Sequence, residues 1–320
     1  MSSQRYAAVD IGGTKVAAGF VDCDGNILCS TREPMIADRD ADTAFACVRN
    51  TLDRLFAENP EVRPASIGIS APGPLDPRTG VILNPPNLPC WRNYPLQQKL
   101  GEAYGLPTVI ENDANAAALA EQRWGAGKDY RIVFYATLGT GVGSGLILNG
   151  KIYNGGMGTA PEAGHITIDF RGPRCGCGKR GCVEGLTSGP GIANRARQIL
   201  SGTKVASLLL ELAGGDASRI TAETVAMAWR SGDPIATETL RITAEMWAVW
   251  FGCIIDVLEP EIIVIGGGMG KLAAAWFDYI RKEIPSWSLN QRAAEIPIAL
   301  ARYSADAGIA GAAALCAASS

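Results

Sequence analysis

One structural plan occurs twice in this chain. Residues 6–30 contain three short apolar segments separated by a glycine-rich turn and by an Asp-Gly turn at positions 24–25. Residues 131–153 repeat this order, with Asn-Gly in the second turn. Short apolar runs bounded by Gly, Asp and Asn are typical of strands in a meander. Because an internal duplication constrains the whole fold, we expect two related α/β lobes that face each other across a cleft.

The remaining segments suggest how the lobes are divided. A chain of 320 residues exceeds the length at which a single core keeps growing, which is about 250–300 residues. We expect a small N-terminal α/β lobe over residues 1–115, joined by a C-terminal helix over about 305–320. A large α/β lobe with a metal-binding loop then covers residues 116–304. The division should fall within residues 113–130.

Helices are expected in several places on the basis of apolar spacing and capping residues. Residues 42–58 have helical spacing, with Asp42 placed as the N-cap. After the cysteine-rich segment the chain becomes mainly helical, over about 189–213, 221–231 and 234–257. Residues 307–318 indicate a final helix of small residues.

Composition excludes some classes of partner. The chain has 29 Lys and Arg residues against 32 Asp and Glu residues, and it has no basic run, which argues against nucleic acid. No apolar run approaches the roughly 18 residues of a membrane-spanning helix. Nine cysteines without a secretory signal indicate a reducing compartment. We therefore expect a cytoplasmic protein with no membrane partner.

The only histidine lies next to a tight cysteine cluster. His165 is followed by Cys175, Cys177 and Cys182, so one nitrogen and three sulfur donors fall within eighteen positions. Four protein ligands of these types suit a structural, tetrahedral zinc site. The alternative is a set of reduced cysteines beside a hydrogen-bonded histidine. Ligand-like spacing this tight favours Zn²⁺ as a structural cofactor.

The first turn of each meander has the composition of a phosphate-binding site. Residues 10–15 place an acid, two glycines, a hydroxyl and a cation between two strands. Successive N–H groups in such a turn can form an anion-binding concavity. A plain hairpin with a Gly-Gly turn is the alternative, but residues 138–143 supply a matching glycine-threonine turn. We expect the two turns to hold a polyphosphate, with residues 266–268 as a further nucleotide contact.

Asp113 is the candidate for acid–base work. It follows a strand and opens a helix, so it falls at the edge of an α/β sheet where ligands bind. Its carboxylate could accept a hydroxyl proton while the oxygen attacks phosphorus. An N-cap role explains the position of Asp113 equally well. Asn112, Glu162 and Glu184 offer groups suited to vicinal hydroxyls, and the metal cluster could fix the loops of the two glutamates.

Four motifs together resemble the ROK family. They are Asp-Ile-Gly-Gly-Thr-Lys at residues 10–15, Glu-Asn-Asp-Ala-Asn-Ala-Ala-Ala at 111–118, Glu-x-Gly-His at 162–165 and Cys-Gly-Cys-Gly-x-x-Gly-Cys-x-Glu at 175–184. This family groups bacterial sugar kinases and sugar-responsive repressors, and the resemblance covers nearly the whole chain. It implies the actin-like/hexokinase-like ATPase fold, with duplicated ribonuclease H-like lobes.

The resemblance also implies a role for each matching residue. Asp113 would be the catalytic base on the primary hydroxyl of the sugar, and Asn112 would bind ring hydroxyls. The other sugar contacts would be Glu162, His165 and Glu184 at the anomeric end, and Gly73 and Asn87 on the opposite side. The contacts to ATP would be Gly12, Gly13, Thr14, Lys15, Thr140 and Gly141, with Gly266 and Gly267 as the further contact. Asp10 would lie near Mg²⁺, through water, and His165, Cys175, Cys177 and Cys182 would bind zinc.

The expected activity is ATP-dependent phosphorylation of a hexose at the 6-hydroxyl, with glucose as the leading substrate. Alternatives are N-acetylmannosamine, N-acetylglucosamine, fructose, mannose or allose, and polyphosphate as donor. A sugar-responsive repressor is the rival from another class. It is disfavoured because the phosphate turn begins at residue 10 and leaves no room for a DNA-reading module. The helices around residues 229–250 could form a homodimer, which is common in the family, or simply pack in the core.

Overall fold

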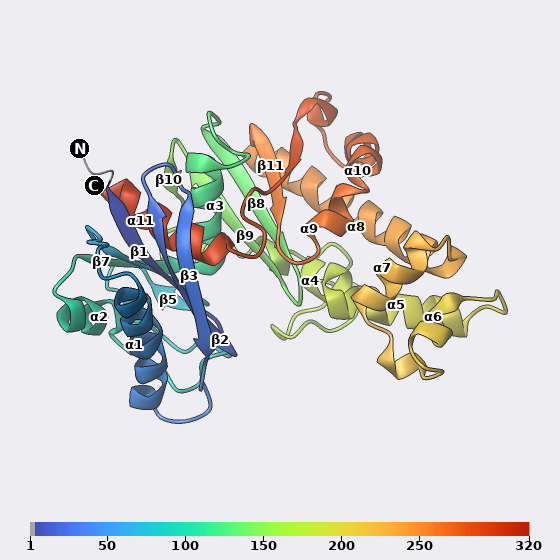
Figure 1. Cartoon of the computed structure of the whole chain (residues 1–320). Coiled ribbons are helices and arrows are strands. Elements are labelled where there is room, and N and C mark those ends of the chain that lie inside the picture. The colour runs from blue at the N-terminus through green and yellow to red at the C-terminus, as the bar shows by residue number, and fades with distance from the viewer. Residues whose placement is uncertain (1–3, 320) are drawn as a thin grey trace. The chain divides into compact units, whose positions relative to one another are not determined.

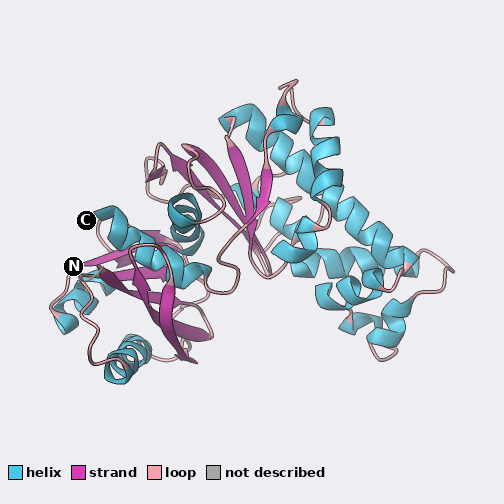
Figure 2. Ribbon diagram, turned by 45° about the horizontal axis from the view of Figure 1, so that its top comes forward, coloured by secondary structure: helices cyan, strands magenta, loops and turns pink. Residues whose placement is uncertain are grey.

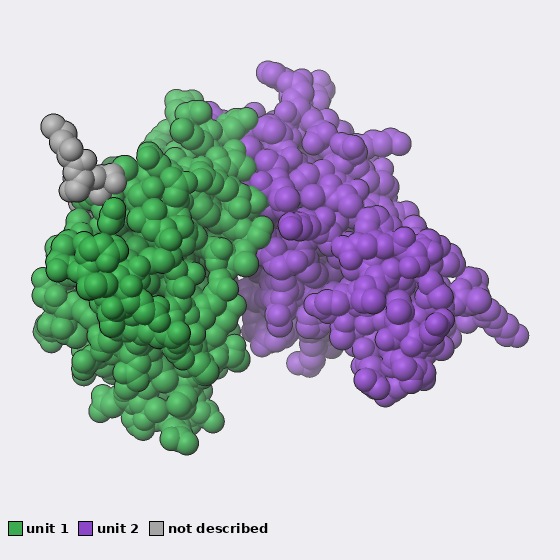
Figure 3. All heavy atoms as spheres, in the orientation of Figure 1, with its two compact units in different colours: residues 1–135, 145–161, 301–320 green, residues 136–144, 162–300 purple. Residues whose placement is uncertain are grey.

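The computed structural model of the protein describes residues 4–319, which form two compact units. Figure 3 colours unit 1, which takes Met1–Tyr135, Gly145–Pro161 and Ala301–Ser320, and unit 2, which takes Ala136–Ser144 and Glu162–Leu300. The functional lobes expected over residues 1–115 and 116–304 stay a prediction.

Unit 1 is built on a five-stranded sheet of order β3-β2-β1-β4-β7. The first three strands form an antiparallel meander, and β4 and β7 run parallel to β1. The strands are β1 (Arg5–Ile11), β2 (Lys15–Asp22), β3 (Ile27–Pro34), β4 (Ile67–Ala71) and β7 (Thr108–Asn112). A two-stranded sheet of β5 (Leu75–Asp76) and β6 (Val81–Ile82) follows β4 along the chain.

Helices cover both faces of this sheet, which explains why residues 6–9 of β1 are all apolar and buried. Ala7, Val9 and Ile11 belong to the core that includes α1 (Ala41–Glu58), and α2 (Leu96–Tyr104) adds to the same side. Tyr6 and Ala8 pack instead with α11 (Ala307–Ser319), beside which lies α3 (Asp113–Trp124) (Figure 1). Alternate residues of one strand therefore serve two cores, as expected for a doubly covered sheet.

The small residues of α11 allow an unusually close approach to the sheet. A Cβ atom at Gly68 in β4 would lie 1.8 Å from the carbonyl oxygen of Ala312. A Cβ at Gly311 would lie 2.6 Å from the backbone of Ala116 in α3. Packing therefore requires glycine at these two positions, and the small-residue composition that predicts the final helix also explains where the helix lies.

The second sheet repeats the arrangement of the first. Its order is β10-β9-β8-β11-β12, which matches β3-β2-β1-β4-β7 strand for strand. The strands are β8 (Ile132–Leu138), β9 (Val142–Leu148), β10 (Lys151–Ile152), β11 (Ile262–Gly266) and β12 (Ile298–Leu300). The predicted α/β class and the internal duplication are confirmed. The chain passes from one unit to the other within β8 and again within β9.

Most of the described helices, drawn in cyan in Figure 2, have residue ranges that fall in unit 2. They are α4 (Val183–Thr187), α5 (Gly189–Ser201), α6 (Leu208–Leu212), α7 (Ala222–Arg230), α8 (Pro234–Leu258), α9 (Gly270–Ala274) and α10 (Phe277–Glu283). Short 3-10 turns are η1 (Ala163–His165), η2 (Ala217–Arg219), η3 (Ile284–Ser286) and η4 (Ala293–Glu295). Trp247 and Trp250 of α8 are buried, so these two side chains pack in a core. Within residues 4–319, no helix is long and apolar enough to cross a membrane.

Two local expectations were wrong. The N-cap of α1 is Asp40 and not Asp42, because Asp40 accepts a hydrogen bond from the backbone N–H of Thr43 at 2.8 Å and another from its hydroxyl. The helix expected over 189–213 is divided into α5 and α6. Its first part ends at Gly202, and Ser207 caps the second part.

We expect Gly68→Ala to destabilise the protein, because the added methyl group would overlap the backbone of α11. Overpacking of this kind costs about 1–3 kcal/mol. Chemical denaturation of the variant and the wild type would measure the free energy of unfolding. Gly156→Ala is the matched control, since no atom lies within 4 Å of the position of its Cβ. Equal losses in both variants would contradict the packing argument.

Candidate active site

In unit 1, polar residues occupy one edge of the sheet, where three parallel strands end. Asp10 of β1 lies opposite Ser70 of β4, and Ser70 lies opposite Glu111 of β7. The hydroxyl of Ser70 donates to Oδ1 of Asp10 at 3.4 Å. The carboxyl ends of parallel strands are the usual location of ligand sites in α/β sheets.

Asp113 begins α3 directly after β7. The N-cap is Asn112, whose Oδ1 accepts from the N–H groups of Ala114 at 3.0 Å and Asn115 at 3.3 Å. The capping role weighed for Asp113 is therefore filled by its neighbour. The Asp113 side chain keeps a solvent-exposed face, but protein surrounds it on its other sides. This desolvation raises the pKa of the Asp113 carboxyl. The hydrogen bond from the N–H of Ala114 lowers the pKa, but by less.

A second acid with a raised pKa lies close by. Burial, and then the charge of Asp113, raise the pKa of Asp10 from 3.8 to about 6, while Lys15 lowers it. The first turn of α11 also contacts this carboxyl, because a Cβ at Gly308 would lie 2.1 Å from Cγ of Asp10. Two neighbouring carboxylates with perturbed pKa values are typical of functional sites, where like charges held close together shift the pKa values of catalytic groups.

The structure brings the other sequence-predicted residues of unit 1 to this edge. A Cβ at Gly73 would lie 3.4 Å from Nδ2 of Asn112, and one at Gly13 would lie 2.7 Å from the carbonyl oxygen of Asn87. Gly13 therefore contacts the loop that contains Asn87, and a larger residue would not fit there.

The first turn predicted to bind phosphate, residues 10–15, is a hairpin between β1 and β2. The N–H of Gly12 donates to the carbonyl oxygen of Lys15 at 2.9 Å, and Thr14 and Lys15 are exposed. The hairpin alternative weighed from the sequence is thus the observed local structure. It leaves a hydroxyl and an ammonium group available to a ligand, so hairpin and phosphate site are compatible.

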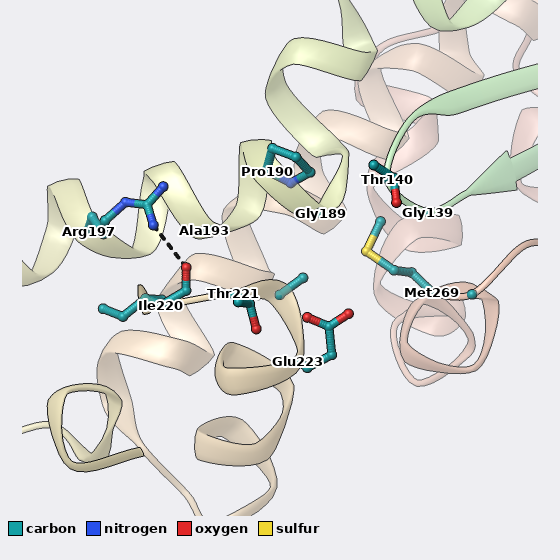
Figure 4. A pocket seen from close by; sticks show the side chains of 12 residues that line it. Gly139, Thr140, Gly189, Pro190, Ala193, Arg197, Ile220, Thr221, Glu223 and Met269 are labelled. Atoms are coloured by element: carbon teal, nitrogen blue, oxygen red, sulfur yellow. Dashed lines mark hydrogen bonds between the residues drawn. The ribbon is translucent and has the colours of Figure 1, made fainter. Parts of the chain in front are cut away.

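Unit 2 contains a cavity of about 550 Å³ (Figure 4). The turn between β8 and β9 forms one side, and the starts of α5 and α7 and the segment after β11 form the others. The lining residues are Gly139, Thr140, Gly189, Pro190, Ala193, Arg197, Ile220, Thr221, Ala222, Glu223, Gly268 and Met269. Its volume lies within the range of small-molecule sites, which is about 300–1,000 Å³. It is large enough for a nucleoside.

Most of this lining was missed by sequence reasoning. Thr140 was predicted as a nucleotide contact, but Arg197 and Glu223 were not. Arg197 donates to the carbonyl oxygen of Ile220 at 2.9 Å and so fixes one wall, and the Glu223 carboxylate lies at the cavity in Figure 4. These residues come from separate helices and belong to no short motif. The signal in the sequence was the Gly-Pro-Gly stretch at residues 189–191, which begins α5.

The glycines after β11 have distinct positions. Gly268 lines the cavity, whereas Gly266 is buried at the end of the strand. Gly267 has a φ of 81°, and its Cβ would lie 2.4 Å from the carbonyl oxygen of Leu138, so only glycine suits this turn. Nucleotide contacts by Gly266 and Gly267 stay a prediction.

The predicted metal ligands converge in space. One ligand atom from each of His165, Cys175, Cys177 and Cys182 lies within 4.8 Å of the others. Nδ1 of His165 is 3.7 Å from Sγ of Cys175, and Cys177 and Cys182 have their sulfurs 3.7 Å apart. One nitrogen and three sulfurs at this separation fit a tetrahedral zinc ion. Burial raises the pKa of the metal-free Cys175 thiol to about 12, so metal binding would have to release its proton.

Glu162 and Glu184 flank this cluster in different ways. Oε2 of Glu162 is 3.9 Å from Nε2 of His165, and the side chain of Glu162 is 67% exposed. Oε1 of Glu184 is 3.6 Å from Sγ of Cys175, and its Oε2 accepts from the N–H of Val142 at 3.1 Å. Glu184 therefore joins the cysteine cluster to the turn between β8 and β9, which was predicted to bind phosphate. The sequence did not indicate this link.

The chain matches the model of the ROK family over residues 6–319. It is 36% identical over 282 residues to a glucokinase of Streptomyces coelicolor, covering 87% of this chain and 86% of that protein. It is 35% identical over 313 residues to an N-acetylmannosamine kinase of Salmonella newport, covering 96% and 97%. A crystal structure of a ROK family glucokinase from Streptomyces griseus with glucose and AMPPNP superimposes with a TM-score of 0.81 at 34% identity, covering 97% and 98%.

These matches, together with the repeated sheet order, confirm the actin-like/hexokinase-like fold that was expected from the four motifs. The family match spans residues 6–319, which is almost every residue that the structure describes. The chain belongs to the ROK family.

Proposed function

We propose that this protein transfers the γ-phosphoryl group of ATP to the 6-hydroxyl of a hexose, with glucose as the preferred sugar. The observation that carries the proposal is Asp113, a carboxylate with a raised pKa that keeps an exposed face beside Asn112 and Asp10. The similarity to glucokinases of 36% identity supports glucose.

The chemistry follows from the position of the base. As the oxygen of the 6-hydroxyl forms a bond to the γ-phosphorus, Asp113 accepts the hydroxyl proton. The bond from the γ-phosphorus to the bridging oxygen breaks, and ADP leaves with that electron pair. A raised pKa suits this role, because a base whose pKa is closer to the working pH accepts the proton more effectively.

Sugar contacts are proposed for residues of both units. Asn112, Gly73 and Asn87 of unit 1 would bind ring hydroxyls, and Glu162, His165 and Glu184 of unit 2 would bind the anomeric end. Carboxylates and amides suit this task because each can form two hydrogen bonds to vicinal hydroxyls.

For the nucleotide, we propose the unit 2 cavity as the site of the base and ribose. Thr140, which lines this cavity, and Gly141 would contact the phosphates, as would Gly12, Gly13, Thr14 and Lys15 of unit 1. Asp10 would hold Mg²⁺ through water, and this ion would neutralise charge on the phosphates.

A kinase for N-acetylmannosamine is the second candidate, supported by the relative of that name at 35% identity. A panel of hexoses and N-acetylhexosamines with ATP or polyphosphate, read by coupled ADP release or by sugar phosphate formation, decides between them. The proposal expects glucose with ATP to give the highest kcat/KM. Turnover of N-acetylmannosamine alone would replace the substrate and keep the reaction class. The expected homodimer and cytoplasmic location stay predictions.

Asp113→Asn should lower kcat by about 10²- to 10⁴-fold, since the variant cannot accept the proton. Sugar affinity, measured by titration calorimetry, should change little because the amide keeps the shape of the side chain. Asp278→Asn is the control, an exposed acid paired with Arg281. Turnover of Asp113→Asn near the wild-type level would refute the assignment of the base.

Asp10→Asn should raise stability at neutral pH while lowering turnover. The folded-state pKa of about 6 exceeds 3.8, so above pH 6 the carboxyl group is ionised in the folded protein at a cost in stability. Removing that charge should add up to about 3 kcal/mol to the free energy of unfolding at pH 7. The wild type should lose this increment as the pH rises from about 4 to about 6, and the two proteins should be equally stable below pH 4. Thermal melts across this range, without nucleotide, provide the measurement. A variant that is less stable than the wild type at pH 7 would contradict the electrostatic argument.

We also propose that His165, Cys175, Cys177 and Cys182 bind a structural zinc ion that holds the loops of Glu162 and Glu184. Zinc removal with a chelator should lower both the melting temperature and the affinity for glucose, and added Zn²⁺ should restore them. Glucose binding in the absence of ATP is the measurement. Unchanged glucose affinity after complete removal, verified by metal analysis, would separate the metal from the sugar site.

A further inference from the structure

A buried carboxylate that the proposed reaction does not use lies one residue before the sugar-binding Asn112. Glu111 is 4% exposed. Its Oε1 accepts from the N–H of Asn112 at 2.8 Å, and its Oε2 accepts from Nδ2 of Asn154 at 2.7 Å. Burial raises its pKa, and these hydrogen bonds lower it. A buried charge is retained only where its hydrogen bonds compensate for lost hydration.

A buried amide joins the same residues from α3. Asn115 is 3% exposed, and its Nδ2 lies 3.3 Å from Oδ1 of Asn154 and 3.0 Å from the carbonyl oxygen of Ala160. It is also 3.5 Å from Oε1 of Glu111. Within residues 4–319, Oδ1 of Asn115 has no hydrogen-bond partner. An unsatisfied buried acceptor is unfavourable, so the hydrogen bonds donated by Nδ2 must be what keeps this side chain in place.

The partner of both residues is a closed loop over residues 154–160, which precedes Glu162. The N–H of Ala160 donates to the carbonyl oxygen of Asn154 at 3.1 Å, so the loop closes on itself. Gly155 has a φ of 68°, and its Cβ would lie 2.9 Å from that of Ala160. The loop is therefore compact, and side chains of β7 and α3 hold its two ends.

We propose that Glu111, Asn115 and Asn154 form a positioning network that fixes the loop 154–160 to the turn bearing the catalytic base. This inference rests on the proposed kinase function. Glu111 holds the N–H of Asn112, Asn112 caps α3, and Asp113 is the first residue of that helix. Loss of the network would free the turn, so that Asp113 no longer keeps the orientation that proton transfer requires.

The chain permits a test by reversing donor and acceptor. Glu111→Gln places an amide donor against a donor, and Asn154→Asp places two carboxylates 2.7 Å apart. Together the two substitutions restore one donor facing one acceptor and keep the net charge of the wild type. Oδ1 of residue 154 still accepts from Asn115 in both backgrounds.

Each single variant should lower kcat about tenfold at 25 °C with KM for ATP unchanged, and the double variant should return to within about threefold of the wild type. Amide hydrogen exchange of residues 154–160 should speed up in the single variants and slow again in the double variant. Asn26→Asp is the matched control, because Nδ2 of Asn26 donates to Oδ2 of Asp22 at 3.0 Å in an exposed turn. It should leave kcat unchanged.

Two results would overturn the proposal. Single variants that melt at lower temperature but keep full kcat would make the network a structural anchor only. A double variant whose kcat does not exceed that of the less active single variant would show that the pairing of these groups does not matter. If the wild type phosphorylates none of the sugars, the kinase proposal fails. The exchange rates then decide separately whether the network holds the loop, and rates unchanged in the single variants would refute it.

Discussion

The close contact between the last helix and the first sheet is the constraint on which unit 1 depends. A Cβ at Gly68 would overlap the backbone of α11, and one at Gly308 would overlap the carboxyl group of Asp10. The same helix therefore completes a core and closes one side of the candidate active site. A helix of larger residues would lie further from the sheet, because packed interiors have no spare volume. It would leave the acid of β1 in water, with an ordinary pKa.

Unfavourable electrostatics accompany this packing. The charge of Asp113 raises the pKa of Asp10 because strands and helices hold the two residues at one edge of the sheet, and burial raises the pKa of Asp113. Pairs of carboxylates are destabilising in themselves, and proteins keep them where a reaction needs charge or a base. At the same edge, hydrogen bonds stabilise two further buried polar residues, Glu111 and Asn115. The site is therefore maintained by the scaffold and not by the attraction of its own residues.

Much of the fold could be predicted from the sequence because it rests on local patterns. The repeated meander predicted two related α/β lobes, and the two sheets indeed share one strand order. The spacing of His165 and its cysteines predicted their convergence. The N-cap of α1 was wrong because Asp40 and Asp42 are both good caps, and only backbone geometry separates them. The cavity in unit 2 could not be predicted, since its walls come from separate helices that bear no shared motif. The Glu111 network was missed for the same reason, as Asn154 lies 43 positions away.

The position of α11 in the sequence has a consequence for synthesis on the ribosome. The face of the first sheet formed by Tyr6, Ala8, Ala17 and Val21 is covered by Ile309 and its neighbours, which are translated after unit 2. Residues 136–300, which include all of unit 2, emerge before that cover does. Domains commonly fold as they emerge from the N-terminus onward. Here the first sheet must instead wait, with an apolar face open to chaperones, until α11 has emerged.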